Sequence, residues 1–175
     1  GSGDLTHGPL LFAAAQTGLP LILSTGMATL EDIDQALGIV AFCWTAVDGS
    51  PSTAACDVAR RSDAGRQALQ ERLVLLQCTT EYPAPFNEVN LRVMAEFRER
   101  YGVPVGFSDH TPGTAVPLAA VALGATLIEK HFTLDKALPG PDHRASLDPL
   151  ELQAMVQGIR AVEASLGSSH KTVGP

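Results

Sequence analysis

Two histidines, His110 and His131, each follow a short apolar run that is typical of a buried strand. These runs cover residues 103–107 and 125–128. The 21 positions between the histidines fit one strand–helix–strand step, which in a parallel sheet brings both imidazoles to the same edge. Two imidazoles so placed can hold a divalent metal and leave its other positions open to a substrate. The alternative is that one or both are structural histidines that only make hydrogen bonds.

Length, charge and cysteine usage narrow the class of protein. The chain has 175 residues, enough for one domain with a sizeable core, and 45% of them are hydrophobic. A net charge of −7 without a basic stripe argues against a nucleic-acid partner. No run approaches the roughly 18 apolar residues of a membrane span, and no signal peptide is visible. Three cysteines without CxxC spacing indicate reduced thiols and a cytoplasmic location.

Strand-like and helix-like segments alternate along the chain. Apolar stripes at helical spacing follow the strand-like runs, and Thr29 and Asp148 stand where N-caps are expected. The region 42–69 is looser, with a loop at 48–53, and we interpret it as an elaboration of one connection. The expected strands are 19–25, 72–80, 103–109 and 125–133, and the expected helices are 30–41, 54–71, 88–101, 114–124 and 149–166.

Four strand–helix units with buried strands predict an α/β chain with a parallel sheet. The sequence has neither GxGxxG after its first strand nor GxxxxGK[ST], the motifs that usually support a nucleotide-binding fold. Polar residues follow every expected strand, which is the layout of a barrel active site. A complete (β/α)8 barrel needs about 250 residues, so this chain would be part of one. An open doubly wound sheet remains the alternative.

Six ordered stretches outside residues 42–69 resemble the N-acetylneuraminate (sialic acid) synthase family. They read GSGDLT, LILSTGMATLEDI, QCTTEYPAPFNEVNLRVM, GFSDHT, ALGATLIEKHFT and GPDHRASLDP. The resemblance implies a partial TIM (β/α)8 barrel, about strands five to eight with their helices, as one incomplete domain over residues 1–175. The first half of the barrel, a lysine before Gly1 and an antifreeze-like domain would then lie outside this chain. The whole protein would be a homodimer.

The resemblance also implies a reaction. Phosphoenolpyruvate would condense with an N-acetylated aminosugar, either N-acetylmannosamine or a diacetamido-trideoxy sugar, to give a nine-carbon 2-keto sugar acid and phosphate. A divalent metal, manganese or magnesium, would be held by His110 and His131. Such a metal would polarise the sugar carbonyl as a Lewis acid.

Further site residues follow from the same resemblance. Four hydroxyl-bearing residues match phosphate-binding positions, although Thr80 stands where some members have asparagine. Tyr82 matches a catalytic-site tyrosine that faces the sugar, and two acidic residues match sugar-binding positions. The hydroxyl-bearing residues are Ser2, Ser24, Thr80 and Ser108, and the acidic residues are Asp4 and Asp142.

Other interpretations of these residues stay open. A serine at a strand end is by itself an ordinary cap residue, and an aspartate after Gly-Pro is an ordinary turn residue. The enzyme alternative is another metal-dependent barrel aldolase. A Schiff-base aldolase would need a lysine at a strand end, but Lys130 should point away from the face of His131. Either Glu129 or Lys130 is expected to form a salt bridge within the barrel, and Cys78 to be a core residue. The non-enzyme alternative is a stand-alone binding or assembly module, and we expect this chain alone to be inactive.

Overall fold

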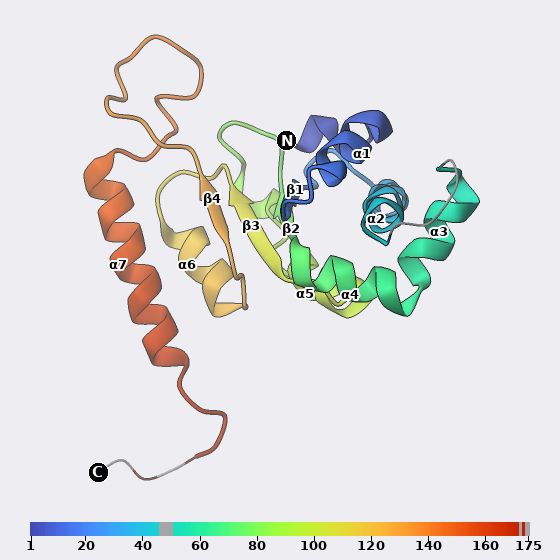
Figure 1. Ribbon diagram of the computed structural model, residues 1–175. Coiled ribbons are helices and arrows are strands. Elements are labelled where there is room, and N and C mark those ends of the chain that lie inside the picture. Colours follow the sequence, from blue (N-terminus) through green and yellow to red (C-terminus); the bar gives the residue numbers. More distant parts are fainter. Residues whose placement is uncertain (46–50, 172, 174–175) are drawn as a thin grey trace.

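Four parallel strands form the centre of the computed structural model, which describes residues 1–45, 51–171 and 173 (Figure 1). The strands lie side by side in chain order, so β1 and β4 are at the two edges of the sheet. This arrangement confirms the α/β class and the parallel sheet that the sequence predicts. The strands are β1 (Leu21–Ser24), β2 (Leu73–Cys78), β3 (Val105–Asp109) and β4 (Ile128–Lys130).

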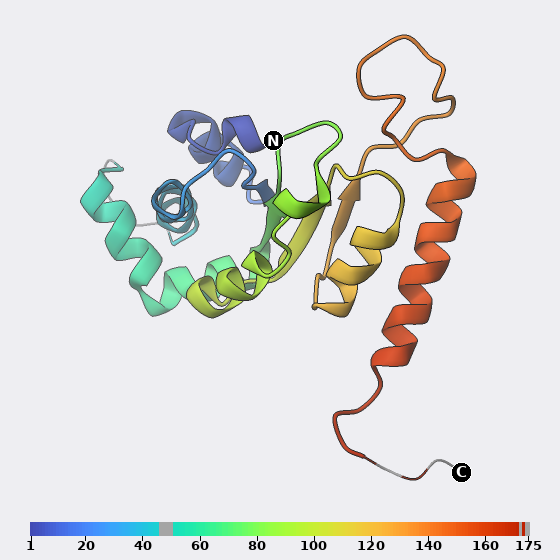
Figure 2. The same ribbon diagram turned by 180° about the vertical axis from the view of Figure 1, so that it is seen from behind.

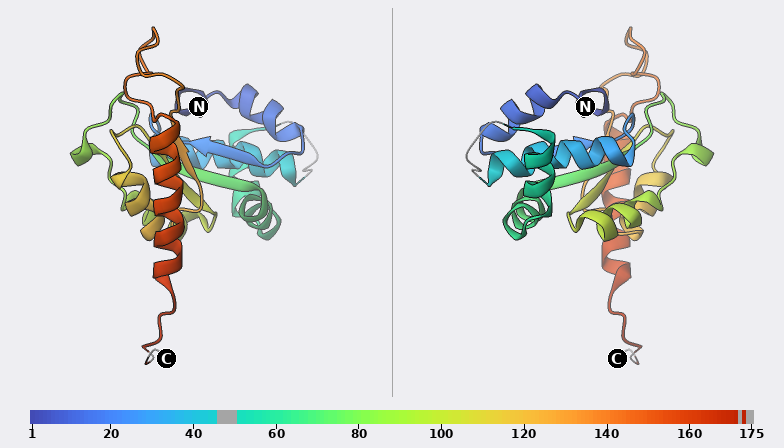
Figure 3. Two further views of the ribbon diagram at one scale, coloured as in Figure 1. Left: turned by 90° about the vertical axis from the view of Figure 1, so that its left-hand side faces the viewer. Right: turned by 90° about the vertical axis from the view of Figure 1, so that its right-hand side faces the viewer.

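Helices fill the connections between the strands. Seen from behind and from two sides, α7 stands beside α6 at one end of the sheet, whereas α2, α3 and α4 gather at the other (Figures 2 and 3). Among the described residues, no helix is long and apolar enough to cross a membrane. The helices are η1 (Ser2–Asp4), α1 (Gly8–Gln16), α2 (Leu30–Trp44), α3 (Thr53–Arg61), α4 (Asp63–Arg72), η2 (Phe86–Glu88), α5 (Val93–Tyr101), α6 (Ala115–Ala122) and α7 (Pro149–Leu166).

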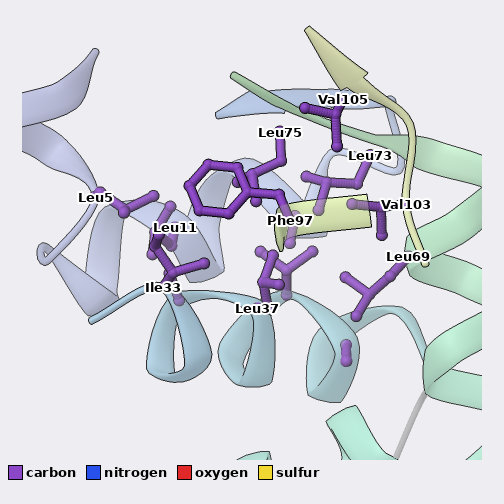
Figure 4. Close-up of a cluster of buried hydrophobic side chains, with 14 of the residues drawn as sticks. Leu5, Leu11, Ile33, Leu37, Leu69, Leu73, Leu75, Phe97, Val103 and Val105 are labelled. Atoms are coloured by element: carbon purple, nitrogen blue, oxygen red, sulfur yellow. The ribbon is translucent and has the colours of Figure 1, made fainter. Parts of the chain in front are cut away.

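The two faces of the sheet have different surroundings because successive side chains of a strand point to opposite faces. Leu75 and Val105 point toward the helices, where they pack with Leu37 of α2 and Phe97 of α5 (Figure 4). The alternating residues lie on the other face, where Ile22 is 53% exposed. One face is therefore the main core, and the opposite face carries the candidate site described below.

The prediction of a helix over residues 88–101 is wrong for residues 88–92. Residues Phe86–Glu88 form a short 3-10 helix, and α5 begins only at Val93. Between them Asn90 has a φ of 49°, a left-handed conformation that asparagine tolerates better than most residues and that interrupts a helix. Gly102 ends α5 with a φ of 65°, as its position predicts.

The expected single helix 54–71 is in fact two helices, α3 and α4. Ser62 joins them in an extended conformation, and its Oγ accepts a hydrogen bond from the Gly65 amide. A Cβ on Gly65 would lie 1.9 Å from the Ala59 carbonyl oxygen, so only glycine lets the two helices approach so closely. In the expected loop 48–53, residues 48–50 lie outside the described residues, and Thr53 already belongs to α3.

The remaining differences lie at element ends and in α1. Strand β4 is shorter than expected, and the sequence analysis did not predict α1, an apolar stretch without a helical stripe that has Pro9 in its first turn. The two expected N-caps are confirmed. Thr29 and Asp148 each form a reciprocal capping box with the acidic residue three positions later.

An acidic residue, Asp34, connects three helices of the outer layer. Its carboxylate lies 2.7 Å from Arg100 on α5 and 3.5 Å from Arg60 on α3. Burial alone would raise the pKa of the Asp34 carboxyl. The hydrogen bond from Arg100 and the charge of Arg60 outweigh burial and hold that pKa below its usual value.

Replacing Asp34 with asparagine should therefore destabilise the protein in a pH-dependent way. Because the folded pKa of Asp34 is lowered, its contribution is present above the usual carboxyl pKa of 3.8 and is lost as the pH falls through the folded value. At pH 7 we expect a loss of about 1 kcal/mol in the free energy of unfolding, measured with urea. The loss should vanish in strong acid. Glu99→Gln, at an exposed position on α5, is the control. An Asp34→Asn effect independent of pH would contradict the ion-pair assignment.

Candidate active site

Three aromatic or imidazole rings meet where β2, β3 and β4 end. His110 follows β3, His131 follows β4, and Tyr82 lies in the loop after β2. The ring centroids of the two histidines are 5.2 Å apart, and Tyr82 lies 4.2 Å from His110 and 5.3 Å from His131. The structure thus confirms that both histidines reach the same sheet edge. It also brings Tyr82 to them.

The hydrogen bonds of His110 define which of its nitrogens is available. Its Nδ1 lies 2.7 Å from the carbonyl oxygen of Thr79, which can only accept, so Nδ1 carries the proton. The lone pair is then on Nε2, the state of an imidazole that binds a metal. Burial would lower the pKa of His110, but its bonds to Cys78 and Thr79 raise that pKa overall. The main chain of His110 is also fixed, because its carbonyl accepts from the Ala84 amide.

Cys78, which the sequence analysis assigned to the core, is buried but lies within the site. Its Sγ is 3.7 Å from His110 Nδ1 and 3.6 Å from the hydroxyl of Ser2. Burial would raise the pKa of the Cys78 thiol, but hydrogen bonds with His110, Ser2 and Ser108 hold that pKa below its usual value. The thiol is therefore a polar neighbour of the histidine cluster.

A row of polar side chains crosses the three strands beside the histidines. Cys78 of β2 is the register partner of Ser108 on β3, and Ser108 is the partner of Glu129 on β4. The Ser108 hydroxyl donates to Glu129 at 2.7 Å. The contact of Glu129 with Ser108 is not among the sequence predictions. The period-two pattern of the strands could have found it, since Glu129 and His131 share a face.

Three hydroxyl-bearing residues surround the first strand end. Ser24 ends β1, and two residues later the Gly26 amide donates to Ser2 Oγ at 3.0 Å. A Cβ on Gly26 would lie 2.3 Å from Thr80 Oγ1 and 3.0 Å from Ser2 Oγ. Only glycine therefore allows Ser2 and Thr80 to close around this turn. Of the predicted phosphate-binding residues, Ser2 and Thr80 meet at this turn, Ser24 lies two residues before Gly26, and Ser108 is two strands away.

The loop after β4 brings Asp142 to the same edge. Its carboxylate lies 4.0 Å from His131 Nδ1. His143, next in sequence, is held differently, because its Nδ1 lies 2.7 Å from the Thr133 hydroxyl. A cavity of about 560 Å³ opens between this loop and the loop that carries Tyr82. Asp142, a sugar-binding residue by resemblance, therefore lies beside His131 at this edge.

Asp4 lies in the same short helix, η1, as Ser2. Its side chain is 62% exposed and lies 3.2 Å from the amino nitrogen of Gly1. Two other acidic side chains contact site residues: Glu129 accepts a hydrogen bond from Ser108, and Asp142 lies beside His131.

The predicted salt bridge within the barrel is formed by Lys130. Its Nζ lies 2.5 Å from the Asp109 carboxylate, and both side chains are buried. Asp109 and Phe107 share a face of β3, and Phe107 belongs to the core under the helices. Lys130 therefore points away from the face of His131, as its position in the strand predicts.

A two-histidine metal site fits the donors that the structure provides. Across residues 1–45, 51–171 and 173, no group of three or more His, Cys, Asp and Glu side chains is arranged to hold a metal ion. His110 has a free Nε2, and His131 lies beside it with Asp142 as a neighbour. Imidazole and carboxylate are ligands that manganese accepts.

Comparison with known proteins identifies relatives of the whole chain. The chain is 44% identical over 170 residues to the N,N'-diacetyllegionaminic acid synthase of Campylobacter jejuni, covering 97% of this chain and 44% of that protein. It is 37% identical over 176 residues to the N-acetylneuraminate-9-phosphate synthase of Homo sapiens, covering 100% of this chain and 42% of that protein. The chain thus spans less than half the length of these two relatives.

Solved structures show the same architecture. The N-acetylneuraminic acid synthetase of Leptospira borgpetersenii, solved with citrate, matches with a TM-score of 0.78 and 31% identity, covering 99% of this chain and 52% of that chain. A truncated 3-deoxy-D-arabino-heptulosonate 7-phosphate synthase from Thermotoga maritima shares the fold with a TM-score of 0.66 at 19% identity, covering 95% of this chain and 58% of that chain. With four parallel strands, these matches confirm the half-barrel. The sequence matches the NeuB family over residues 1–171, so the chain belongs to the NeuB family.

Proposed function

We propose that this chain is the C-terminal half of the catalytic barrel of a sialic-acid-type synthase. The enzyme would condense phosphoenolpyruvate with an N-acetylated aminosugar to form a nine-carbon 2-keto sugar acid and phosphate. The observation that carries the proposal is the meeting of His110, His131 and Tyr82 at one strand edge, beside a group of hydroxyls. Family membership and the names of the relatives support it.

His110 and His131 are the residues that would hold a divalent metal, manganese or magnesium. The Thr79 carbonyl fixes the His110 tautomer and so leaves Nε2 free as a ligand. A bound ion supplies Lewis-acid polarisation of the aldehyde oxygen of the sugar. With only two protein ligands, a bound ion would keep positions for substrate oxygen and water.

The side-chain hydroxyls clustered near the strand ends are suited to binding the phosphate of phosphoenolpyruvate. Ser2 and Thr80 close around Gly26, Ser24 ends β1, and Ser108 lies next to the last residue of β3. Hydroxyls and main-chain amides at such an edge donate hydrogen bonds to phosphate oxygens. These residues would hold the phosphate while the enol carbon faces the histidines.

Tyr82 and Asp142 would position the sugar. Tyr82 lies beside both imidazoles and is partly exposed toward the cavity between the loops. Asp142 lies next to His131 and can accept hydrogen bonds from sugar hydroxyls. The new carbon–carbon bond would form between C3 of phosphoenolpyruvate and the aldehyde carbon. Water would add at C2, and the C2–O bond to phosphate would break to leave the ketone.

The buried position of Lys130 argues against a Schiff-base aldolase. Its ammonium group is paired with Asp109 on the helix-covered face, and its side chain is only 3% exposed. A Schiff-base lysine must reach the substrate carbonyl as a free amine.

The direct test is phosphate release from phosphoenolpyruvate by the full-length protein that contains this chain, with manganese. N-Acetylmannosamine and the diacetamido-trideoxy sugar should be compared, each with and without a chelator. We expect phosphate release that depends on one of the two sugars and is abolished by the chelator. The sugar that supports release is the acceptor. The isolated chain should be inactive, because the sheet face that carries Ile22 is open. No release with either sugar would contradict the proposal.

His110→Ala and His131→Ala in the full-length protein should each abolish metal-dependent activity. Since each removes a direct ligand, we expect a larger loss of manganese affinity than the roughly 100-fold that an outer partner contributes. Electron paramagnetic resonance of unbound Mn²⁺ measures the affinity. His170→Ala, at an exposed position, is the control and should bind normally. Near-normal turnover of either variant would rule out the metal assignment.

Gly26→Ala should weaken phosphoenolpyruvate binding without unfolding the protein. The added methyl would push against Ser2 Oγ and Thr80 Oγ1 and displace hydroxyls that we assign to the phosphate. Losing one hydrogen bond to a charged group is worth about 1.5–3 kcal/mol, or at least about tenfold in affinity. Isothermal titration with phosphoenolpyruvate measures this change.

The matched control is Gly3→Ala, since a Cβ on Gly3 would meet nothing within 4 Å. Equal affinities of the Gly26→Ala variant and the wild-type protein would argue against a phosphate site at this turn.

A further inference from the structure

The buried ion pair between Asp109 and Lys130 lies directly before the two histidines. Asp109 precedes His110 at the end of β3, and Lys130 precedes His131 at the end of β4. The two residues are register partners, and their charged atoms are 2.5 Å apart. Their side chains are 0% and 3% exposed, so water does not screen the attraction. The pair therefore joins the last residues of two strands whose next residues are the imidazoles.

The same pair fixes the main chain on both sides of His110. Asp109 Oδ1 accepts a hydrogen bond from the Thr111 amide at 2.9 Å, and Lys130 Nζ donates to the Thr111 carbonyl. The residues before and after His110 are thus both bonded to one buried cluster. The imidazole itself lies on the other face, where Nδ1 donates to Thr79.

His131 is held by Lys130 on one side and by the following loop on the other. Its carbonyl accepts from the Leu147 amide at 2.9 Å, which fixes the main chain after the strand. Its imidazole lies beside the rings of Tyr82 and His110 and near the carboxylate of Asp142. The position of this ring consequently depends on the main-chain direction that Lys130 and Leu147 impose.

We propose that Asp109 and Lys130 are positioning residues that set the separation of the two imidazoles, and thereby the affinity of the site for a divalent metal. The metal part of this statement rests on the proposed function. A buried ion pair is by itself weak support for stability, because desolvation offsets much of the attraction. Removal of one partner leaves an unpaired buried charge, whereas removal of both charges can leave stability nearly unchanged. Stability and positioning can therefore be measured separately.

The test compares Lys130→Met with the double variant Asp109→Asn, Lys130→Met in the full-length protein. Thermal unfolding reports stability, electron paramagnetic resonance reports Mn²⁺ affinity, and ¹⁵N NMR of the histidines reports the tautomer and environment of each ring without metal. We expect Lys130→Met to lower both stability and affinity. The double variant should recover most of the stability while its Mn²⁺ affinity stays about 10–100-fold below wild type. Its metal-free His110 and His131 signals should be shifted.

Arg100→Met is the matched control, because it removes an ion pair between elements of the outer layer. It should lower stability and leave both the histidine spectra and Mn²⁺ affinity unchanged. If the double variant regains wild-type affinity and histidine spectra together with stability, the pair is only structural and the proposal is wrong. If wild type binds no Mn²⁺, the metal assignment fails. In that case the histidine spectra alone test whether the ion pair positions the imidazoles. Unshifted His110 and His131 signals in the double variant would overturn that proposal.

Discussion

The parallel register of β2, β3 and β4 is the constraint on which the candidate site depends. It aligns Cys78, Ser108 and Glu129 in a row across the sheet and places the residues after each strand at one edge. Two imidazoles that are far apart in sequence come within 5.2 Å because their strands are neighbours that end at the same level. A shift of one residue in either strand would send an imidazole into the core under the helices. The packing of the helix-covered face fixes that register, and the candidate site on the opposite face therefore depends on it.

Much of this arrangement could be predicted from the sequence. Continuous apolar runs such as 103–107 are typical of buried parallel strands, and polar residues after them mark the edge of the sheet. The capping boxes at Thr29 and Asp148 are local patterns that a sequence displays directly. The alternation of successive side chains between the two faces of a strand also predicts correctly that Lys130 lies on the face opposite His131. These predictions succeed because each rests on neighbours in the chain or on a strict alternation.

Other features depend on contacts that no local pattern shows. The turn at Asn90 and the break at Ser62 are set by left-handed and extended backbone conformations, which their residue types permit but do not require. Cys78 resembles an ordinary core residue, and only the approach of Ser2 and His110 from distant segments makes it part of the site. The partner of Lys130 likewise emerges only when the register of β3 and β4 is known.

The junction at Ser62 has a consequence for how this protein can vary. One residue ends α3 and begins α4, so the two helices meet at a tight corner, pack on α2 and lead into the amino end of β2. The six residues of β2 separate this corner from the carboxyl edge, a distance of about 20 Å at roughly 3.3 Å per residue. A change in the length of the junction between α3 and α4 can therefore be accommodated without moving a residue of the candidate site. This connection is a place where relatives can differ in length and still share a chemistry.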